Sequence, residues 1–145
     1  MNIEIRPLED KDIEALLAQL KEFAQFQKHP KSMTNTVEQL RQDREHFKCY
    51  VALVDSTIIG YTIYYPAYSS WSGKALYIED LYVTTKSRNL GIGKKLLDTV
   101  IKEAKSTQCK KVKWQVSKWN KNAQEFYRHM GAEIDETEIN CDLSF

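Results

Sequence analysis

A glycine-rich turn stands between two apolar stretches of the chain, and its sequence is Arg88-Asn89-Leu90-Gly91-Ile92-Gly93-Lys94. The stretch before it, 76–83, has the composition of a strand, and the stretch after it, 92–104, has the apolar spacing of a helix. Backbone N–H groups gather where a strand turns into a helix N-terminus, and they attract phosphate. The turn therefore predicts a site for a nucleotide-type cofactor.

Two well-known phosphate loops do not fit this turn. A Walker loop needs Ser or Thr directly after Gly-Lys to hold magnesium, and here Lys95 follows Gly93-Lys94. A dinucleotide fingerprint needs a third glycine after a first strand, but Leu96 stands at that position, and three strands are predicted before the strand 76–83 that leads into the turn. A glycine pair also occurs where a strand simply turns into a helix, so other residues must decide between a site and a turn.

Two adjacent carboxylates, Glu79 and Asp80, interrupt the otherwise apolar and aromatic strand 76–83. Alternation along a strand predicts that their side chains point to opposite faces of the sheet. Carboxylates in such a place either take part in proton transfer or pair with a lysine or arginine. For Asp80 both interpretations stay open, whereas for Glu79 the functional one is favoured.

The spacing of apolar residues predicts an α/β fold in a single domain, 1–145, with one mixed, mostly antiparallel sheet. The pattern contains about seven strands and about four helices. The predicted strands are 3–7, 49–54, 58–65, 76–83, 112–116, 132–134 and 138–143, and the predicted helices are 10–24, 36–47, 92–104 and 120–130. The last two strands would form a terminal hairpin.

Composition narrows the class of protein. The chain has 145 residues and carries 21 Lys and Arg against 20 Asp and Glu, so no overall charge favours nucleic acid or a membrane surface. Three cysteines, Cys49, Cys109 and Cys141, lack metal-ligand spacing, and reduced thiols are expected. No apolar run has the length of a membrane span or the flanks of a signal peptide, so we expect a cytoplasmic protein.

A resemblance to a family rests on two separated motifs. With its arginine included, the turn reads Arg-x-x-Gly-x-Gly, which resembles the cofactor signature of the GNAT N-acetyltransferase superfamily. The segment 119–132 resembles the second signature, an Asn followed by Phe126-Tyr127 and then Gly131. Within the superfamily the likeness is greatest to spermidine/spermine (diamine) and thialysine N-acetyltransferases, through Ile5-Arg6-Pro7, 64–73, 76–83 and Trp119-Asn120.

The resemblance implies acetyl-CoA as the cosubstrate and no metal. The backbone of Leu81, Tyr82 and Val83 would pair with the pantetheine arm like an added strand. The N–H groups of the glycine turn would take the pyrophosphate, assisted by the helix dipole. The implied cofactor residues are Leu81, Tyr82, Val83, Arg88, Asn89, Leu90, Gly91, Ile92, Gly93, Lys94, Asn120, Asn122 and Tyr127.

Acetyl transfer to an amine also needs proton transfer. An alkylamine with a pKa of ~10.4 is mostly protonated at pH 7, which costs roughly 4 to 5 kcal/mol. The resemblance implies that Glu79, directly or through water, takes this proton. It also assigns Tyr127 as the acid that protonates the departing thiolate. Without the resemblance, Tyr127 beside Phe126 would be interpreted as a core aromatic.

The acceptor site is predicted from a second group of residues. The implied acceptor residues are Phe26, Gln27, Glu79, Asp80 and Trp114, although alternation with Val112 equally predicts a core position for Trp114. Related polyamine enzymes are acidic where this chain has the basic loop 26–31. A basic loop would repel a polyamine and favour an amine that also carries a carboxylate, such as lysine or thialysine.

The expected function is direct acetyl transfer to a primary amine of a small molecule, in a homodimer. Two other functions stay open. The acceptor could be a protein lysine or N-terminal amine, or the chain could be a non-catalytic acetyl-CoA-binding regulatory module. The intact Glu79 and Tyr127 disfavour the second of these.

Overall fold

The computed structural model describes residues 2–145 of the protein. They form two compact units, one ending at Gln115 and the other running from Val116 to Phe145. The first unit holds the strands β1 (Ile3–Pro7), β2 (Lys48–Val54), β3 (Thr57–Ser69), β4 (Gly73–Val83) and β5 (Lys111–Trp114), and the helices α1 (Ile13–Phe26), α2 (Val37–Gln42) and α3 (Ile92–Ser106). Short 3-10 turns lie at Asp10–Asp12, Pro30–Ser32, Arg44–His46 and Thr85–Ser87.

The five strands form one sheet in the order β1-β2-β3-β4-β5, antiparallel throughout except for the parallel pair of β4 and β5. The predicted hairpin of β2 and β3 is confirmed, and Asp55 and Ser56 form its two-residue turn with φ values of 49° and 70°. The helix predicted over 36–47 is shorter: α2 ends at Gln42 and a 3-10 turn follows.

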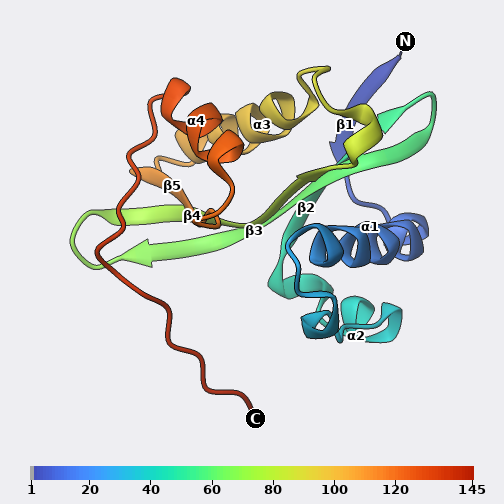
Figure 1. Ribbon diagram of the computed structural model, residues 1–145, viewed down its shortest axis with the longest axis horizontal. Coiled ribbons are helices and arrows are strands. Elements are labelled where there is room, and N and C mark those ends of the chain that lie inside the picture. The colour runs from blue at the N-terminus through green and yellow to red at the C-terminus, as the bar shows by residue number, and fades with distance from the viewer. Residues whose placement is uncertain (1) are drawn as a thin grey trace. The chain divides into compact units, whose positions relative to one another are not determined.

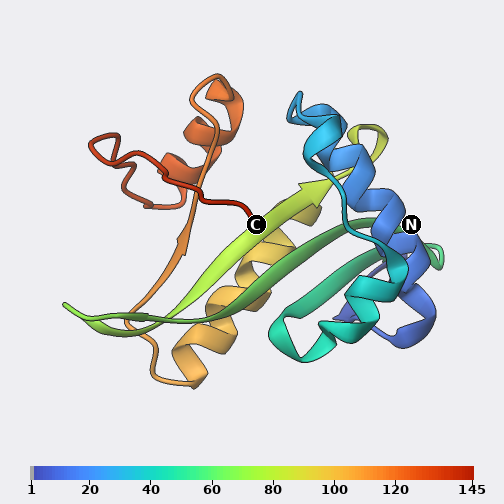
Figure 2. The same cartoon turned by 90° about the horizontal axis from the view of Figure 1, so that it is seen from below.

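The helices of the first unit cover both faces of its sheet, as Figures 1 and 2 show. Helices α1 and α2 pack on one face against Val51, Tyr61, Ile63 and Tyr82. Helix α3 packs on the other face, where Ile92 and Leu96 meet Ala52 and Val83. The α1 face is important for function, because the carboxylates of β4 lie there.

The second unit contains α4 (Lys121–His129), followed by a tail without helix or strand. Asn120 caps α4 by accepting a hydrogen bond from the N–H of Ala123 at 3.2 Å. The two terminal strands predicted from alternation over 132–143 are wrong. Alternation makes a strand only where an edge is available to pair with, and here Asp135 instead closes a local turn through the N–H and hydroxyl of Thr137. The sheet of the described residues therefore has five strands rather than seven.

Candidate active site

A groove of about 570 Å³ opens on the α1 face of the sheet in the first unit. Its apolar wall comes from Leu20, Leu40, Phe47 and Ile63. Its polar lining includes the carboxylates of Asp43, Glu79 and Asp80 together with Asn35, His46 and Tyr65. Among the described residues, no lysine or arginine lines it. A hollow that combines an apolar wall with three carboxylates suits a small ligand that carries positive charge.

A β-bulge in β4 places both carboxylates in this groove. Ile63 pairs with Asp80, but the next residue of β3, Tyr64, pairs with Ile78, so Glu79 is the extra residue of β4. The prediction that Glu79 and Asp80 point to opposite faces is therefore wrong. Strict alternation holds only for an unbroken ladder, and the bulge interrupts it at this position.

Asp80 is half-buried, and its surroundings favour the protonated form. Burial is the main cause that raises the pKa of its carboxyl to about 7, and the negative charge of Glu79 adds to the effect. The hydroxyl of Tyr61 opposes them by donating a hydrogen bond to Asp80 Oδ2 at 3.3 Å. Asp80 consequently titrates near neutral pH, as a general base should.

Glu79 has a more open position than Asp80. Its side chain is exposed, and its Oε1 lies 3.5 Å from the hydroxyl of Tyr65. Burial, and next the charge of Glu79, raise the pKa of Tyr65, so this phenol stays protonated and can donate to the carboxylate. Glu79 is thus placed to attract an ammonium group at the mouth of the groove.

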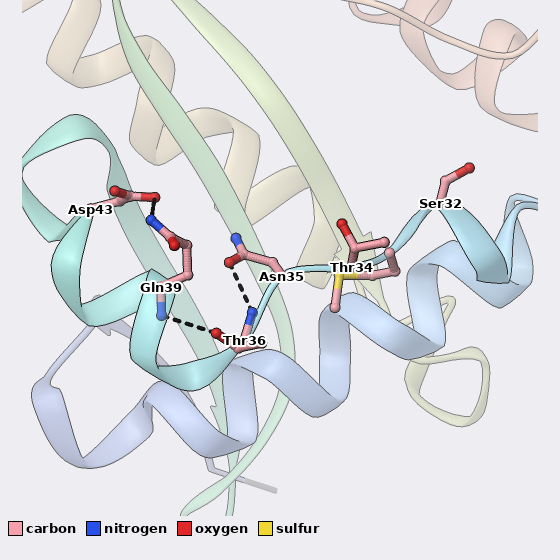
Figure 3. Close-up of a pocket in the computed structure, with 7 residues that line it drawn as sticks. Ser32, Thr34, Asn35, Thr36, Gln39 and Asp43 are labelled. Carbon is pink, nitrogen blue, oxygen red and sulfur yellow. Dashed lines mark hydrogen bonds between the residues drawn. The ribbon is translucent and has the colours of Figure 1, made fainter. Parts of the chain in front are cut away.

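A second, polar hollow of about 480 Å³ adjoins the groove and shares Met33, Asn35 and Asp43 with it. Figure 3 shows how its polar side chains satisfy one another. Asp43 accepts a hydrogen bond from Gln39 Nε2 at 2.9 Å, and Thr36 caps α2 through the N–H of Gln39 at 3.1 Å. Asp43 has an amide as its partner and forms no ion pair with a lysine or arginine in the part of the chain that the structure describes, so its charge is available to a ligand.

Sequence reasoning missed the groove residues contributed by α2 and β3. Asp43 lies within the helix predicted over 36–47, and Tyr65 ends the strand predicted over 58–65, but neither was predicted to belong to a site. No motif surrounds either residue. Only the packing of α2 over the bulge shows that they line the groove.

The glycine turn has the backbone geometry of a ligand cradle. Gly91 adopts a φ of 75° and directly precedes α3, and Asn89 before it has a φ of 68°. A Cβ added at Gly91 would meet no atom within 4 Å, and one added at Gly93 would make only an ordinary contact with Val83. The left-handed backbone at Gly91 therefore favours glycine, and the space beside it is open to a ligand.

The basic residues of the turn already have partners. Lys94 Nζ lies 2.7 Å from Asp98, one helical turn further along α3. Arg88 is half-buried, and its Nε donates to the carbonyl of Val83 at 3.0 Å. Leu90 is exposed, whereas the side chain of Ile92 is buried under the sheet, so Ile92 can offer a ligand only its backbone.

The second half of β4 has an edge that no described strand pairs with. β5 pairs with β4 only from Ala75 to Ile78. The next residues, including Leu81, Tyr82 and Val83, keep their pairing with β3 on the other side. Because the Tyr82 side chain is buried on the α1 face, it is the backbone of this segment that can bind an extended ligand.

Three residues of the second unit were predicted to act on the cofactor. Tyr127 is 9% exposed on α4, and burial raises the pKa of its phenol, so it carries its proton at neutral pH. Asn120 uses its amide oxygen as the α4 cap, and Asn122 is exposed in the first turn. Their roles stay predictions.

Three residues predicted to bind the acceptor do not line the groove. Phe26 ends α1 and packs against the ring of Tyr82, with centroids 6.1 Å apart. Gln27 is the C-terminal cap of α1, and Trp114 is the last residue of β5. The lysines of the loop 26–31 also lie outside the lining.

Comparison with known families matches residues 13–132 to the acetyltransferase (GNAT) family. The chain belongs to this family. The resemblance inferred from the two motifs is therefore confirmed, as is the assignment of the chain as an N-acetyltransferase enzyme.

Several curated GNAT relatives act on small amines, according to their names. A thialysine N-epsilon-acetyltransferase of Mus musculus is 33% identical over 97% of this chain and 89% of its own length. An L-ornithine N5-acetyltransferase of Arabidopsis thaliana is 39% identical over 63% of this chain and 40% of its own length. A spermidine/spermine N(1)-acetyltransferase-like protein of Homo sapiens is 33% identical over 89% of this chain, which corresponds to 20% of that protein.

Solved structures share the fold at lower identity. An aminoglycoside acetyltransferase from a soil metagenome has a TM-score of 0.81 and 23% identity over 99% of this chain and 96% of its own. An aminoglycoside N-acetyltransferase in complex with CoA has a TM-score of 0.79 and 18% identity over 98% and 95% of the two chains.

The described residues contain neither a membrane-spanning helix nor a group of metal ligands. None of the helices at 2–145 is both long and apolar enough to cross a membrane. In the same residues, no three His, Cys, Asp or Glu side chains are grouped as metal ligands would be. The expected homodimer and cytoplasmic location stay predictions.

Proposed function

We propose that this GNAT enzyme transfers the acetyl group of acetyl-CoA to the primary amine of a small, positively charged molecule. One observation carries the proposal: the bulge of β4 puts two carboxylates into a groove at the point where the same strand begins its unpaired edge. An amine held in the groove and an acyl donor lying along the edge would meet at the bulge.

The residues present fit acetyl-CoA. The open space beside Gly91 and the N-terminus of α3 would hold its pyrophosphate, and the backbone of 81–83 would hold its pantetheine arm. Acetyl-CoA supplies the activated acetyl group. Every other step depends on how the chain binds, orients and deprotonates the acceptor.

Proton removal falls to the pair Glu79 and Asp80. Sequence reasoning favoured Glu79 as the base, but the geometry favours Asp80, because its carboxyl is half-buried and has a pKa of about 7. Such a group can accept a proton at neutral pH and release it to solvent afterwards. Glu79, which is exposed beside it, would hold the ammonium group and keep the pKa of Asp80 high.

Tyr127 is the proposed acid for the departing thiolate. Its buried phenol has a raised pKa and stays protonated, which a proton donor to a thiolate requires. This assignment rests on the family motif and on the protonation state of the side chain.

The charge of the groove lining indicates which charges the acceptor carries. Three carboxylates and no lysine or arginine line it, so a second cationic group on the acceptor is favoured, with Asp43 as its partner. A carboxylate on the acceptor would have to point away from this lining. The names of the thialysine relatives favour an amino acid as acceptor, and the charge of the groove favours a diamine. Both kinds of molecule carry a second ammonium group besides the amine that is acetylated.

A matched pair of acceptors tests the proposal. Lysine and cadaverine both carry two ammonium groups at neutral pH and differ in one carboxylate, and a monoamine of equal length, with a single ammonium group, serves as the comparison. We expect acetyl-CoA consumption with lysine and cadaverine to exceed that with the monoamine by at least tenfold. Asp43→Asn should reduce this preference and leave the monoamine rate unchanged. Equal rates with all three amines would reject the need for a second ammonium group, and an absence of saturable acetyl-CoA binding would reject the function itself.

A further inference from the structure

Arg88 is the first residue of the glycine turn, and its guanidinium group packs against the last residue of α1. Its Cζ lies 4.3 Å from the centroid of the Phe26 ring and 5.6 Å from that of Tyr82. Its Nε donates to the carbonyl of Val83 at 3.0 Å. A guanidinium stacked on two rings and bonded to a carbonyl is fixed in position.

The rings under Arg88 are themselves held. Tyr82 donates a hydrogen bond to Glu22 Oε2 of α1 at 2.6 Å, and its ring lies 5.0 Å from that of Phe23. The last two turns of α1 are thus joined to the end of β4. Arg88 extends this connection to the glycine turn.

Phe26 is the last residue of α1, and the chain after it forms part of the acceptor groove through Met33 and Asn35. Arg88 therefore touches the strand end proposed for pantetheine, the turn proposed for pyrophosphate, and the helix end from which the acceptor wall departs. No other basic residue of the turn does so, since Lys94 is paired along α3.

We propose that Arg88 is a positioning residue that fastens the cofactor turn to the end of α1, and that it acts through Phe26 rather than by direct contact with phosphate. This inference rests on the proposed function, because it concerns the binding of acetyl-CoA. The planar guanidinium group is essential to this positioning role. A lysine has the charge but cannot stack and bond to the carbonyl in the same way.

The two roles predict different results for conservative variants. If Arg88 positions the turn, Arg88→Lys and Phe26→Leu should each raise the Kd for CoA about tenfold, although Phe26 lies outside the turn. Phe26→Tyr keeps a ring under the guanidinium and should bind CoA like the unchanged protein. The slope of CoA affinity against salt concentration should stay the same, since no phosphate contact is lost.

The experiment is a CoA titration by calorimetry with the full chain and these variants, at three salt concentrations. Lys86→Ala, an exposed charge removal in the neighbouring 3-10 turn, is the control and should have no effect. Thermal unfolding of each variant identifies any loss of fold. In acetyl-transfer assays, kcat at saturation should change less than twofold while the KM for acetyl-CoA rises.

Other outcomes would overturn the inference. Normal CoA binding by Arg88→Lys would overturn it in two cases. In the first, Phe26→Leu also has no effect. In the second, Arg88→Met lowers the slope of CoA affinity against salt concentration; either result would make Arg88 a phosphate ligand. If Phe26→Leu raises only the KM of the amine, Phe26 is an acceptor residue alone. If the unchanged protein itself does not bind CoA, the proposed function fails and the inference falls with it.

Discussion

Tyr61 and Asp80 form a hydrogen bond across the β3–β4 pair, with 3.3 Å between the tyrosine hydroxyl and Asp80 Oδ2. Tyr61 is completely buried, and its ring packs against those of Phe23 and Tyr82. The hydroxyl therefore has a fixed position beside the carboxylate. It is the one described contact that lowers the pKa of Asp80, against burial and the charge of Glu79, which raise it.

Removal of this hydroxyl should raise the pKa of Asp80 further. Tyr61→Phe keeps the ring and deletes the donor to the ionised carboxylate, a change of about 1 kcal/mol, or roughly 0.7 pH units. The acidic limb of the profile of kcat/KM against pH should move to higher pH by that amount. Tyr65→Phe, which removes a donor to Glu79 instead, is the matched comparison. A limb that stays in place in Tyr61→Phe would mean that Asp80 does not set it.

Substitution of the proposed base should remove that limb altogether. Asp80→Asn is expected to lower kcat about 100-fold at pH 7, within the usual range for a lost general base. Glu79→Gln should chiefly raise the KM of the amine. Because the charge of Glu79 raises the pKa of Asp80, Glu79→Gln should also shift the limb to lower pH. If Glu79→Gln costs the larger part of kcat and Asp80→Asn little, the roles are reversed.

The same Asp80→Asn change should stabilise the fold above neutral pH. A carboxyl whose folded pKa of about 7 exceeds its unfolded value of about 4 binds its proton more tightly in the folded state. Its contribution to stability is therefore full below pH 4 and is lost as the pH rises to 7. At pH 8, Asp80→Asn should unfold with a free energy about 4 kcal/mol higher, measured by urea denaturation. At pH 4 the two proteins should be equal, and a stabilisation there would indicate another cause.

Tyr127→Phe should slow acetyl transfer without loss of stability. The phenyl ring fills the same buried space on α4, so the thermal midpoint should change by less than a few degrees. Loss of the proton donor should lower kcat about 10² to 10⁴-fold, with the larger effect at high pH, where solvent supplies few protons. Phe126→Leu, on the exposed neighbour, is the control. Unchanged transfer in Tyr127→Phe at every pH would eliminate it as the acid.

Two substitutions at Gly91 distinguish the effect of backbone strain from the effect of filling the space beside the turn. Gly91→Ala forces a φ of 75° on a residue with a Cβ and should cost about 1 kcal/mol of stability, whereas Gly91→Asn should cost less because asparagine tolerates this conformation. Both side chains enter the open space beside the turn, so both should weaken CoA binding at least tenfold. Normal CoA binding by Gly91→Asn would show that the pyrophosphate lies elsewhere.

The order of the elements as far as β5, the β2–β3 hairpin and α3 follow from periodicity, because each apolar face there meets a partner at the expected spacing. The bulge at Glu79 does not, since one extra residue in a ladder leaves no mark on composition. The tail shows the opposite failure: Ile139, Cys141 and Leu143 alternate as strand residues do, but no strand pairs with them among the described residues. A sequence motif was enough to locate the cofactor turn. The groove is formed partly by α2, and no motif marks that helix.

The unpaired edge of β4 also bears on solubility. A strand edge with open N–H and C=O groups is a template for pairing with other chains, and proteins usually cover such edges. If acetyl-CoA lies along 81–83, it acts as a removable cover. The empty enzyme then has an aggregation-prone edge that the loaded enzyme lacks, so purification and storage with bound CoA should keep the protein monodisperse for longer.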